Sequence, residues 1–182
     1  MPSILLHTCC APCLIYPLAL LEERGLVVTP FFYNPNIHPF REYRARYFAV
    51  VDYCDEHGLS LKVGSYEMER FLASVGVIEP PERCARCFAL RLSRAAAEAR
   101  AHGIASFTTT LLVSPHQNQQ LIREAGEAAA AEHGVRFVFE DMTSGYREAT
   151  EKSREAGMYR QGYCGCVYSE KERYQKSDPP RR

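Results

Sequence analysis

Short apolar runs alternate with longer helical patterns along most of this chain of 182 residues. The apolar runs are rich in the β-branched and aromatic residues that strands favour. They span residues 4–8, 26–34, 59–64, 104–113 and 135–141. Helical patterns lie between them at residues 14–25, 40–54, 84–103 and 116–134. Because parallel strands need crossover connections, this alternation predicts an α/β fold with a five-stranded parallel sheet and helices on both faces.

A sheet of this kind binds ligands at the carboxyl ends of its strands, near the point where the strand order reverses. We therefore expect the loops after the first, second and fourth strands to form the walls of a site. The chain length fits one domain, which we place at residues 1–169 and which includes a cysteine-bearing extension after Gly145. The charged tail, residues 170–182, is expected to be loose.

The composition favours a folded globular protein over a disordered or membrane-embedded one. Apolar residues make up 46% of the chain, charged residues 24%, and the formal net charge is zero. Nucleic-acid binding would therefore have to come from local basic patches. The opening residues MPSILLH lack the basic start and the long apolar run of a signal peptide or membrane span. We expect a cytoplasmic protein with no membrane partner, in which thiols stay reduced.

Seven of the eight cysteines fall in three short groups, and these groups are the strongest chemical signal in the chain. Each group lies in an expected loop or at an expected helix start. The groups are Cys9, Cys10 and Cys13, then Cys84 and Cys87, and then Cys164 and Cys166. Cys54 stands apart on the apolar stripe of helix 40–54, where we expect it to pack as a small hydrophobic residue.

Thiols that converge from three segments in a reducing compartment indicate a metal or an iron–sulfur cluster. Seven candidate ligands are too many for one tetrahedral structural zinc. We expect the nearby helix N-terminus and arginines to lower the pKa of the Cys87 thiol. We also expect Cys9 and Cys10 to point to opposite sides of an extended loop and so to serve two different centres.

Four sequence blocks resemble a known family. They are LLHTCCAPC (5–13), RCARCFALRL (83–92), TTTLLVSPHQN (108–118) and GMYRQGYCGCVYS (157–169). In order and spacing the blocks resemble the QueH family of epoxyqueuosine reductases, which reduce an epoxide on a tRNA anticodon nucleoside to the alkene of queuosine without cobalamin. The likeness extends over nearly the whole chain.

The resemblance implies an oxidoreductase with a nucleotide alpha-hydrolase-like (HUP-like) fold. It also implies a [4Fe-4S] cluster, a second and mononuclear iron, a tRNA substrate and an external electron donor. The expected cofactor-binding residues are Cys9, Cys10, Cys87, Cys164 and Cys166. The expected metal ligands are Cys9, Cys10, Cys13, Cys84, Cys87, Cys164 and Cys166.

Epoxide reduction needs protons as well as electrons. The expected catalytic proton donors are His116, Tyr146 and Tyr163, with Tyr159 as a further candidate. The substrate base is expected to be splayed out of its loop so that it can reach the iron.

Binding of tRNA should depend on local arginines, which suit phosphates and stacked bases, although arginines along a helix also form solvated faces. We expect Arg46 to lie off the apolar stripe of helix 40–54. Ser114 is expected to cap the next helix, with Pro115 in its first turn, and also to contact substrate. The expected substrate-binding residues are Arg86, Arg91, Arg160, Ser114, His116 and Gln117.

Three other functions fit parts of the pattern. An ATP-dependent tRNA-thiolating enzyme can share this fold, but it needs a glycine-rich phosphate loop after the first strand, and residues 7–13 contain no glycine. A zinc-stabilised RNA-binding protein would be colourless, whereas a reductase of this kind would be brown. A disulfide oxidoreductase would show titratable thiols and no metal.

Overall fold

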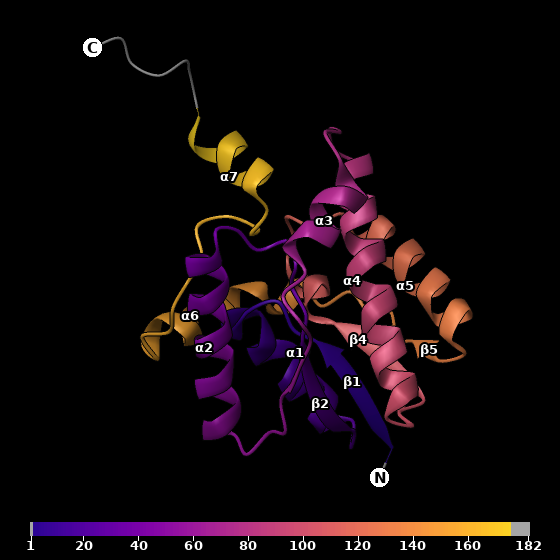
Figure 1. Cartoon of the computed structure of the whole chain (residues 1–182). Coiled ribbons are helices and arrows are strands. Elements are labelled where there is room, and N and C mark those ends of the chain that lie inside the picture. The colour runs from indigo at the N-terminus through magenta and orange to yellow at the C-terminus, as the bar shows by residue number, and fades with distance from the viewer. Residues whose placement is uncertain (1, 176–182) are drawn as a thin grey trace.

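The computed structural model describes residues 2–175, and its centre is a parallel sheet of five strands in the order β3-β2-β1-β4-β5 (Figure 1). The register pairs Leu5 of β1 with Thr29 of β2 on one side and with Phe107 of β4 on the other. The fold prediction is confirmed. The strands are β1 (Ser3–His7), β2 (Val27–Phe32), β3 (Lys62–Val63), β4 (Ser106–Thr109) and β5 (Arg136–Phe137).

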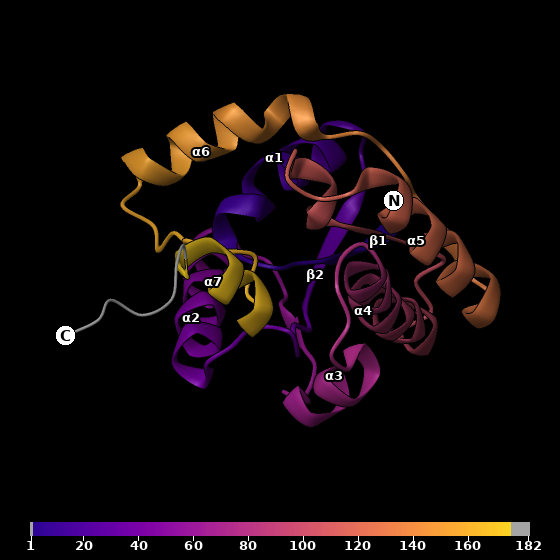
Figure 2. The same ribbon diagram turned by 90° about the horizontal axis from the view of Figure 1, so that it is seen from above.

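Helices cover both faces of the sheet, and shorter elements close its upper end (Figures 1 and 2). The helices are α1 (Ala11–Glu23), α2 (Phe40–Glu56), α3 (Met68–Val75), α4 (Glu82–Ala101), α5 (Gln119–His133), α6 (Tyr146–Glu155) and α7 (Val167–Tyr174). Two short 3₁₀ helices, η1 (Thr110–Val113) and η2 (Thr143–Gly145), complete the fold.

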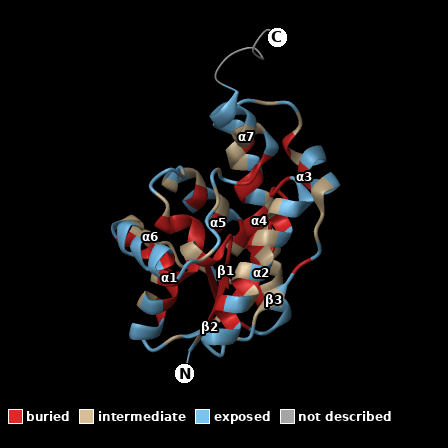
Figure 3. Cartoon of the chain, turned by 90° about the vertical axis from the view of Figure 1, so that its left-hand side faces the viewer, coloured by how far each residue is buried: buried red, intermediate tan, exposed pale blue. Residues whose placement is uncertain are grey.

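Two hydrophobic cores lie on opposite sides of β1 because successive strand side chains point to opposite faces. Ile4 and Leu6 belong to the core beneath α1 and α2, whereas Leu5 packs in the core formed with α4 and α5. A strand covered on both faces needs an unbroken apolar run. The sequence ILL at residues 4–6 meets that need, and Figure 3 shows the buried sheet between exposed helix surfaces.

The strand order places β1 between β2 and β4, so the strand order reverses at β1. The segments after the carboxyl ends of β1, β2 and β4 therefore meet at one edge of the sheet. These are the segments that the sequence predicts as walls of a site. Among them are the cysteine-rich turn at residues 8–13 and the start of η1.

The expected strands at 59–64, 104–113 and 135–141 are longer than those observed. Only two residues each form β3 and β5, and residues 110–113 turn into η1. Thr109 causes this turn, because its side-chain oxygen accepts a hydrogen bond from the Leu111 backbone N–H and so caps a helix start. The β-branched run predicts the strand correctly up to that residue.

The expected cap of the helix after β4 is also wrong. Its cap is Asn118, whose side-chain oxygen accepts a hydrogen bond from Leu121 N, and α5 begins at Gln119. Ser114 and Pro115 instead belong to the turn between η1 and α5, where Ser114 Oγ accepts from His116 N. This turn leaves residues 114–117 free to follow the edge of the sheet.

Cys54 is buried in the core between the sheet and α2, as expected of a small hydrophobic residue. At the other end of the chain, the expected boundary at residue 169 falls inside α7. Residues 176–182 of the expected tail lie outside the described residues. Within residues 2–175, none of the helices has the length and apolar character needed to cross a membrane.

Candidate metal centre

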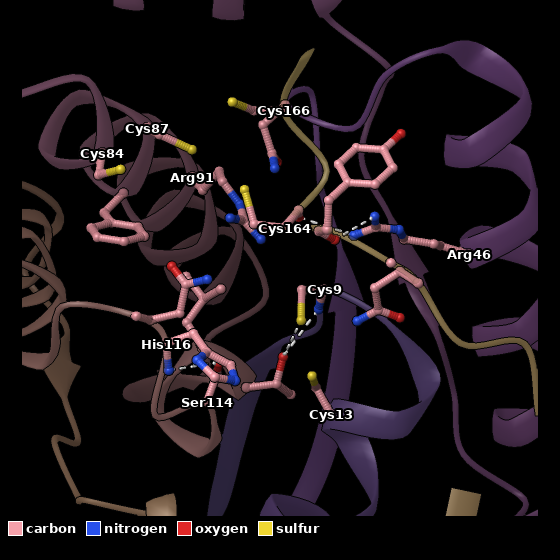
Figure 4. A pocket seen from close by; sticks show the side chains of 18 of the residues that line it. Cys9, Cys13, Arg46, Cys84, Cys87, Arg91, Ser114, His116, Cys164 and Cys166 are labelled. Atoms are coloured by element: carbon pink, nitrogen blue, oxygen red, sulfur yellow. Dashed lines mark hydrogen bonds between the residues drawn. The ribbon is translucent and has the colours of Figure 1, made fainter. Parts of the chain in front are cut away.

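A cavity of about 340 Å³ opens at the carboxyl edge of the sheet, and six cysteines line it (Figure 4). They come from the turn after β1, from α1, from α4 and from the segment before α7. The structure therefore brings all three cysteine groups to one place, as the sequence predicts. The six are Cys9, Cys13, Cys84, Cys87, Cys164 and Cys166.

Cys9, Cys10 and Cys13 form the tightest group, with their three sulfurs all within 4.8 Å of one another. The Sγ atoms of Cys9 and Cys10 are 3.7 Å apart, so the expectation that these two point to opposite sides is wrong. The physical reason is that the chain stops being extended at Cys10, which is the N-cap of α1. The first turn of this helix then brings Cys13 back over the other two thiols.

Buried polar residues hold this turn to the sheet. The His7 ring lies 2.8 Å from Thr109 Oγ1 through Nδ1 and 3.1 Å from the Tyr33 carbonyl through Nε2. Because a carbonyl only accepts, Nε2 carries the proton and Nδ1 accepts from the Thr109 hydroxyl. Burial lowers the pKa of His7 to about 3, so the ring is neutral near pH 7. The side chain thus joins the carboxyl ends of β1, β2 and β4.

Thr110 contacts Cys9 directly. Its hydroxyl oxygen accepts from the Cys9 backbone N–H at 3.1 Å, and its hydroxyl donates to Cys9 Sγ at 3.3 Å. Hydrogen bonds from the Cys10 and Cys13 thiols lower the pKa of Cys9, and Thr110 lowers it further. The hydrogen bonds to Cys10 and Cys9, together with burial, raise the pKa of Cys13. The contacts thus favour the thiolate form at Cys9 and the thiol form at Cys13, and a metal bound by all three sulfurs would displace the remaining protons.

Helix α4 supplies Cys84 and Cys87, three residues apart on its first turns. The expectation for Cys87 is wrong, because burial raises its pKa to about 11 and the nearby charge of Arg91 only partly opposes this. The helix begins at Glu82, so Cys87 lies past the first turn, where the helix dipole has little effect. A bound metal would have to displace this proton.

The last two cysteines lie on the turn before α7, where Cys164 is exposed and Cys166 is buried in a small cluster with Cys87 and two residues of α3. A hydrogen bond from Cys166 lowers the pKa of Cys164 to about 5, and the same contact raises the pKa of Cys166. Gly165 between them has φ +124°, and its carbonyl accepts from the His38 backbone N–H at 2.8 Å. This hydrogen bond joins the turn to the segment that follows β2.

Arg46 holds the same turn from below. Contrary to expectation it is buried, at 1% exposed, and its guanidinium donates to the carbonyls of Tyr163 and Cys164, both at 3.0 Å. Nε donates to Glu42 at 2.7 Å. The helical pattern places Arg46 off the apolar stripe, and its burial depends on a segment more than a hundred residues later in the chain. It therefore contributes to the site and not to a solvated face.

The cavity lining contains several of the expected catalytic and substrate-binding residues. Ser114, His116, Gln117, Tyr146 and Arg160 all line it. The rings of His116 and Tyr146 meet edge to face, with centroids 5.6 Å apart. Because these rings come from the η1–α5 turn and from the start of α6, two separate segments form this side of the opening.

Other expected residues are placed differently. Tyr163 lines the cavity, but its hydroxyl donates to the His38 carbonyl. Tyr159 lies away from the cavity and donates to Glu42. Arg86 is exposed outside the lining and donates to the Ser74 carbonyl at 3.3 Å. Arg91 is almost fully buried but lines the cavity, so its expected contact with the substrate stays a prediction.

Sequence reasoning missed the buried polar residues around the thiols. Asn34 donates to the Thr8 carbonyl at 2.9 Å, and Gln161 donates to Cys10 Sγ at 2.9 Å. Asn36 and Gln161 also line the cavity, and each has a side-chain oxygen without a hydrogen-bond partner in the described residues. The available signal was a set of polar residues directly after apolar runs, as in ILLHT and FFYNPN.

The donor set fits a soft metal. Cysteine sulfur is the ligand that zinc, copper(I) and iron–sulfur clusters share, and the described residues place no carboxylate in the lining of the cavity. Cysteine sulfurs from four segments of the chain surround a space that opens to solvent. A metal group held here would therefore face a substrate.

Comparison with known proteins identifies the family. The family model described as "Epoxyqueuosine reductase QueH" matches residues 4–172. This chain belongs to the QueH family. A relative from Dehalococcoides mccartyi, named epoxyqueuosine reductase QueH, is 41% identical over 180 residues, covering 98% of each chain. A relative of the same name from Thermotoga maritima is 38% identical and covers 97% of this chain and 94% of its own.

Solved structures show the same fold at low sequence identity. The U34-tRNA thiolase NcsA from Methanococcus maripaludis, solved with its [4Fe-4S] cluster, has a TM-score of 0.61 at 14% identity. The match covers 92% of this chain and 61% of the thiolase. A "predicted subunit of tRNA methyltransferase" from Methanocaldococcus jannaschii has a TM-score of 0.60 at 11% identity, covering 85% and 75% of the two chains. These likenesses concern the fold alone.

The QueH-family chain differs from an ATP-binding protein of this fold at the end of β1. A phosphate-binding loop needs glycines there, so that backbone N–H groups can approach the phosphates. Here Cys9 and Cys10 occupy this position, and α1 begins directly at Ala11. Thiols thus occupy the place of the phosphate loop, which argues against the thiolating alternative.

Proposed function

We propose that this chain reduces epoxyqueuosine to queuosine in tRNA. The epoxide takes up two electrons and two protons; both C–O bonds break, and the products are an alkene and water. The observation that carries the proposal is the convergence of six cysteines from three distant segments on one open cavity, in a chain of the QueH family.

The seven grouped cysteines would hold a [4Fe-4S] cluster and a second iron. When bound, these groups supply single electrons and Lewis acidity. The chain positions the ligands by three separate means: the backbone turn at Cys10, the helix α4, and the contacts of Arg46 with the turn at Cys164. An external donor provides the electrons.

His116 and Tyr146 are the proton donors that the geometry supports best. Both line the rim, and their ring contact fixes the direction in which each side chain faces. Tyr163 is a weaker candidate, because its hydroxyl proton is used in the bond to the His38 carbonyl. Its pKa is also raised to about 12, chiefly by burial.

The tRNA approaches over the rim, with the modified base splayed out into the cavity. Arg160 is exposed at the opening and can meet a phosphate or stack on a base. Ser114, His116 and Gln117 face the same opening from the other side. Arg86 is exposed on α4 and lies outside the lining, so it would contact the tRNA beyond the reacting nucleoside.

Metal content and activity test the proposal together. Protein purified without oxygen should be brown, contain iron and sulfide, and convert epoxyqueuosine in tRNA to queuosine with a chemical reductant. Replacing any one of the seven grouped cysteines with alanine should remove iron or activity. Cys54→Ala is the matched control and should keep both, at a stability cost of about 1 kcal/mol for a small cavity. A colourless zinc protein that binds RNA without reducing it would contradict the proposal.

A further inference from the structure

Three of the arginines that line the cavity have side chains that are almost fully buried. Arg46 is 1% exposed, and Arg83 and Arg91 are each 3% exposed. A buried guanidinium keeps its charge, so it needs an anion nearby to offset the loss of hydration. The ion pairs of the three arginines therefore indicate which anions the fold provides and which it lacks.

Two of the three have a carboxylate. Arg46 pairs with Glu42 at 2.7 Å, and Arg83 pairs with Glu172 at 2.7 Å. Arg91 makes no ion pair with a carboxylate in the part of the chain that the structure describes. Its Nη2 donates to Asn34 Oδ1 at 2.7 Å, and its Nε has no hydrogen-bond partner there.

Asn34 cannot supply the missing charge. It is itself 1% exposed, and its amide nitrogen donates to the Thr8 carbonyl, which holds the residue in place with its oxygen toward Arg91. A neutral amide accepts a hydrogen bond but leaves the charge unbalanced. The arrangement therefore fixes a positive charge in a buried position and leaves one side of it open.

The open side faces the thiols. Figure 4 shows Arg91 reaching from α4 toward Cys164, with Cys87 one turn earlier on the same helix and Cys9 beneath. Arg91 lines the same cavity as the thiols of Cys9, Cys87 and Cys164. Because the described lining of this cavity contains no carboxylate, the thiolates and the metal group they would hold are the anions that the cavity can offer to this guanidinium.

We propose that Arg91 is the buried counter-ion of the thiolate-bound iron cofactor and sets its reduction potential. The inference rests on the proposed function, because it requires the iron–sulfur cluster. Net charge and hydrogen bonds to sulfur are among the factors that set the potential of such a cluster. A fixed positive charge stabilises the form with the extra electron, so Arg91 makes the cofactor easier to reduce. In this role Arg91 acts through the cofactor, as a tuning residue.

The test compares Arg91→Gln, Arg91→Lys and wild type, each loaded with iron and titrated by a one-electron reductant without oxygen. Iron per chain and the midpoint potential are the measured quantities. Arg91→Gln should make reduction at least tenfold less favourable, which for one electron is about 59 mV to more negative potential. Arg91→Lys keeps the charge and should stay closer to wild type. Arg94→Gln is the control. It removes another arginine of α4, one that already pairs with Glu98, and should not shift the potential.

The remaining outcomes are also decisive. Loss of iron in Arg91→Gln with iron kept in Arg91→Lys supports the counter-ion role, whereas equal loss in both overturns it. Wild-type iron and potential in Arg91→Gln overturns it as well. If Arg91→Gln does not fold, Asn34→Asp replaces it: a carboxylate beside Arg91 should lower the potential, and an unchanged potential defeats the inference. If the wild-type protein binds no iron, the proposed function itself fails. This result can be told apart from failure of the Arg91 inference, because the outcomes above compare variants of a protein that does bind iron.

Discussion

The thiols at the sheet edge and the thiols near the C-terminus face one cavity but are supported in different ways. Cys9 and Cys10 follow β1 directly, and backbone pairing with β2 and β4 holds that strand on both sides. Cys164 and Cys166 lie on a turn outside the sheet, which the side chain of Arg46 and one bond from His38 hold in place. The first group depends on the backbone ladder, and the second on a few individual contacts.

The comparison indicates which part of the site is more easily lost. A backbone ladder distributes its stabilisation over many hydrogen bonds, so no single side chain decides its position. The turn at Cys164 depends on a few individual contacts, among them those of Arg46, and removing one partner of the buried Arg46–Glu42 pair leaves a charge uncompensated. Changes near the C-terminal turn should therefore cost more than changes of similar size at the sheet edge.

The largest effect is expected from Arg46→Met. It removes both hydrogen bonds to the turn and leaves Glu42 without its cation, at a cost of about 3 kcal/mol in the free energy of unfolding. Iron content should fall as Cys164 and Cys166 lose their positions. Chemical denaturation and iron analysis measure the two effects. Arg44→Met, at an exposed position of the same helix, is the control; equal behaviour of the two variants would refute this role for Arg46.

A smaller effect is expected from Gly165→Ala. A Cβ at this position would lie 2.9 Å from Ile37 Cγ1 and 3.2 Å from Arg46 Nη1, and φ +124° is unfavourable for alanine. The expected cost is about 2 kcal/mol in the free energy of unfolding, together with weaker iron binding. Gly157→Ala, at φ +63° with open space around it, should cost about 1 kcal/mol and leave iron unchanged. Thermal unfolding and iron per chain distinguish the two variants; similar losses would mean that the close contacts at Gly165 do not matter.

The smallest effect on the site is expected from Thr110→Val. It leaves the Cys9 N–H without its acceptor and removes the hydroxyl that donates to Cys9 Sγ, at a cost of about 1.5 kcal/mol. Iron should still bind, because the β1 ladder keeps Cys9 in place, but the visible absorption of the cofactor should shift. Thr108→Val removes a buried bond to the Val138 carbonyl away from the thiols and should lower stability without that shift. Complete loss of iron in Thr110→Val would show that the backbone pairing of β1 is not enough to keep Cys9 in position.

Periodicity predicted the fold well but placed individual residues less well. The alternation of short apolar runs with helical patterns located the sheet and the cysteine groups correctly. Both depend on residues that are near one another in the sequence. Periodicity failed at Ser114 and at residues 110–113, where the side chains of Asn118 and Thr109 cap helix starts. It also failed for Arg46, because a charged residue on a helix gives no local sign that a distant segment will bury it.

By itself, the sequence determined that the chain forms a parallel α/β sheet and that its cysteines gather at the carboxyl edge of that sheet. These outcomes depend on apolar spacing and on strand direction, which are local properties. Only the tertiary structure decided the charges around the thiols. Burial depends on which segments pack together, and it is packing that left Arg46 and Arg83 with carboxylates and Arg91 with a neutral amide and the thiols.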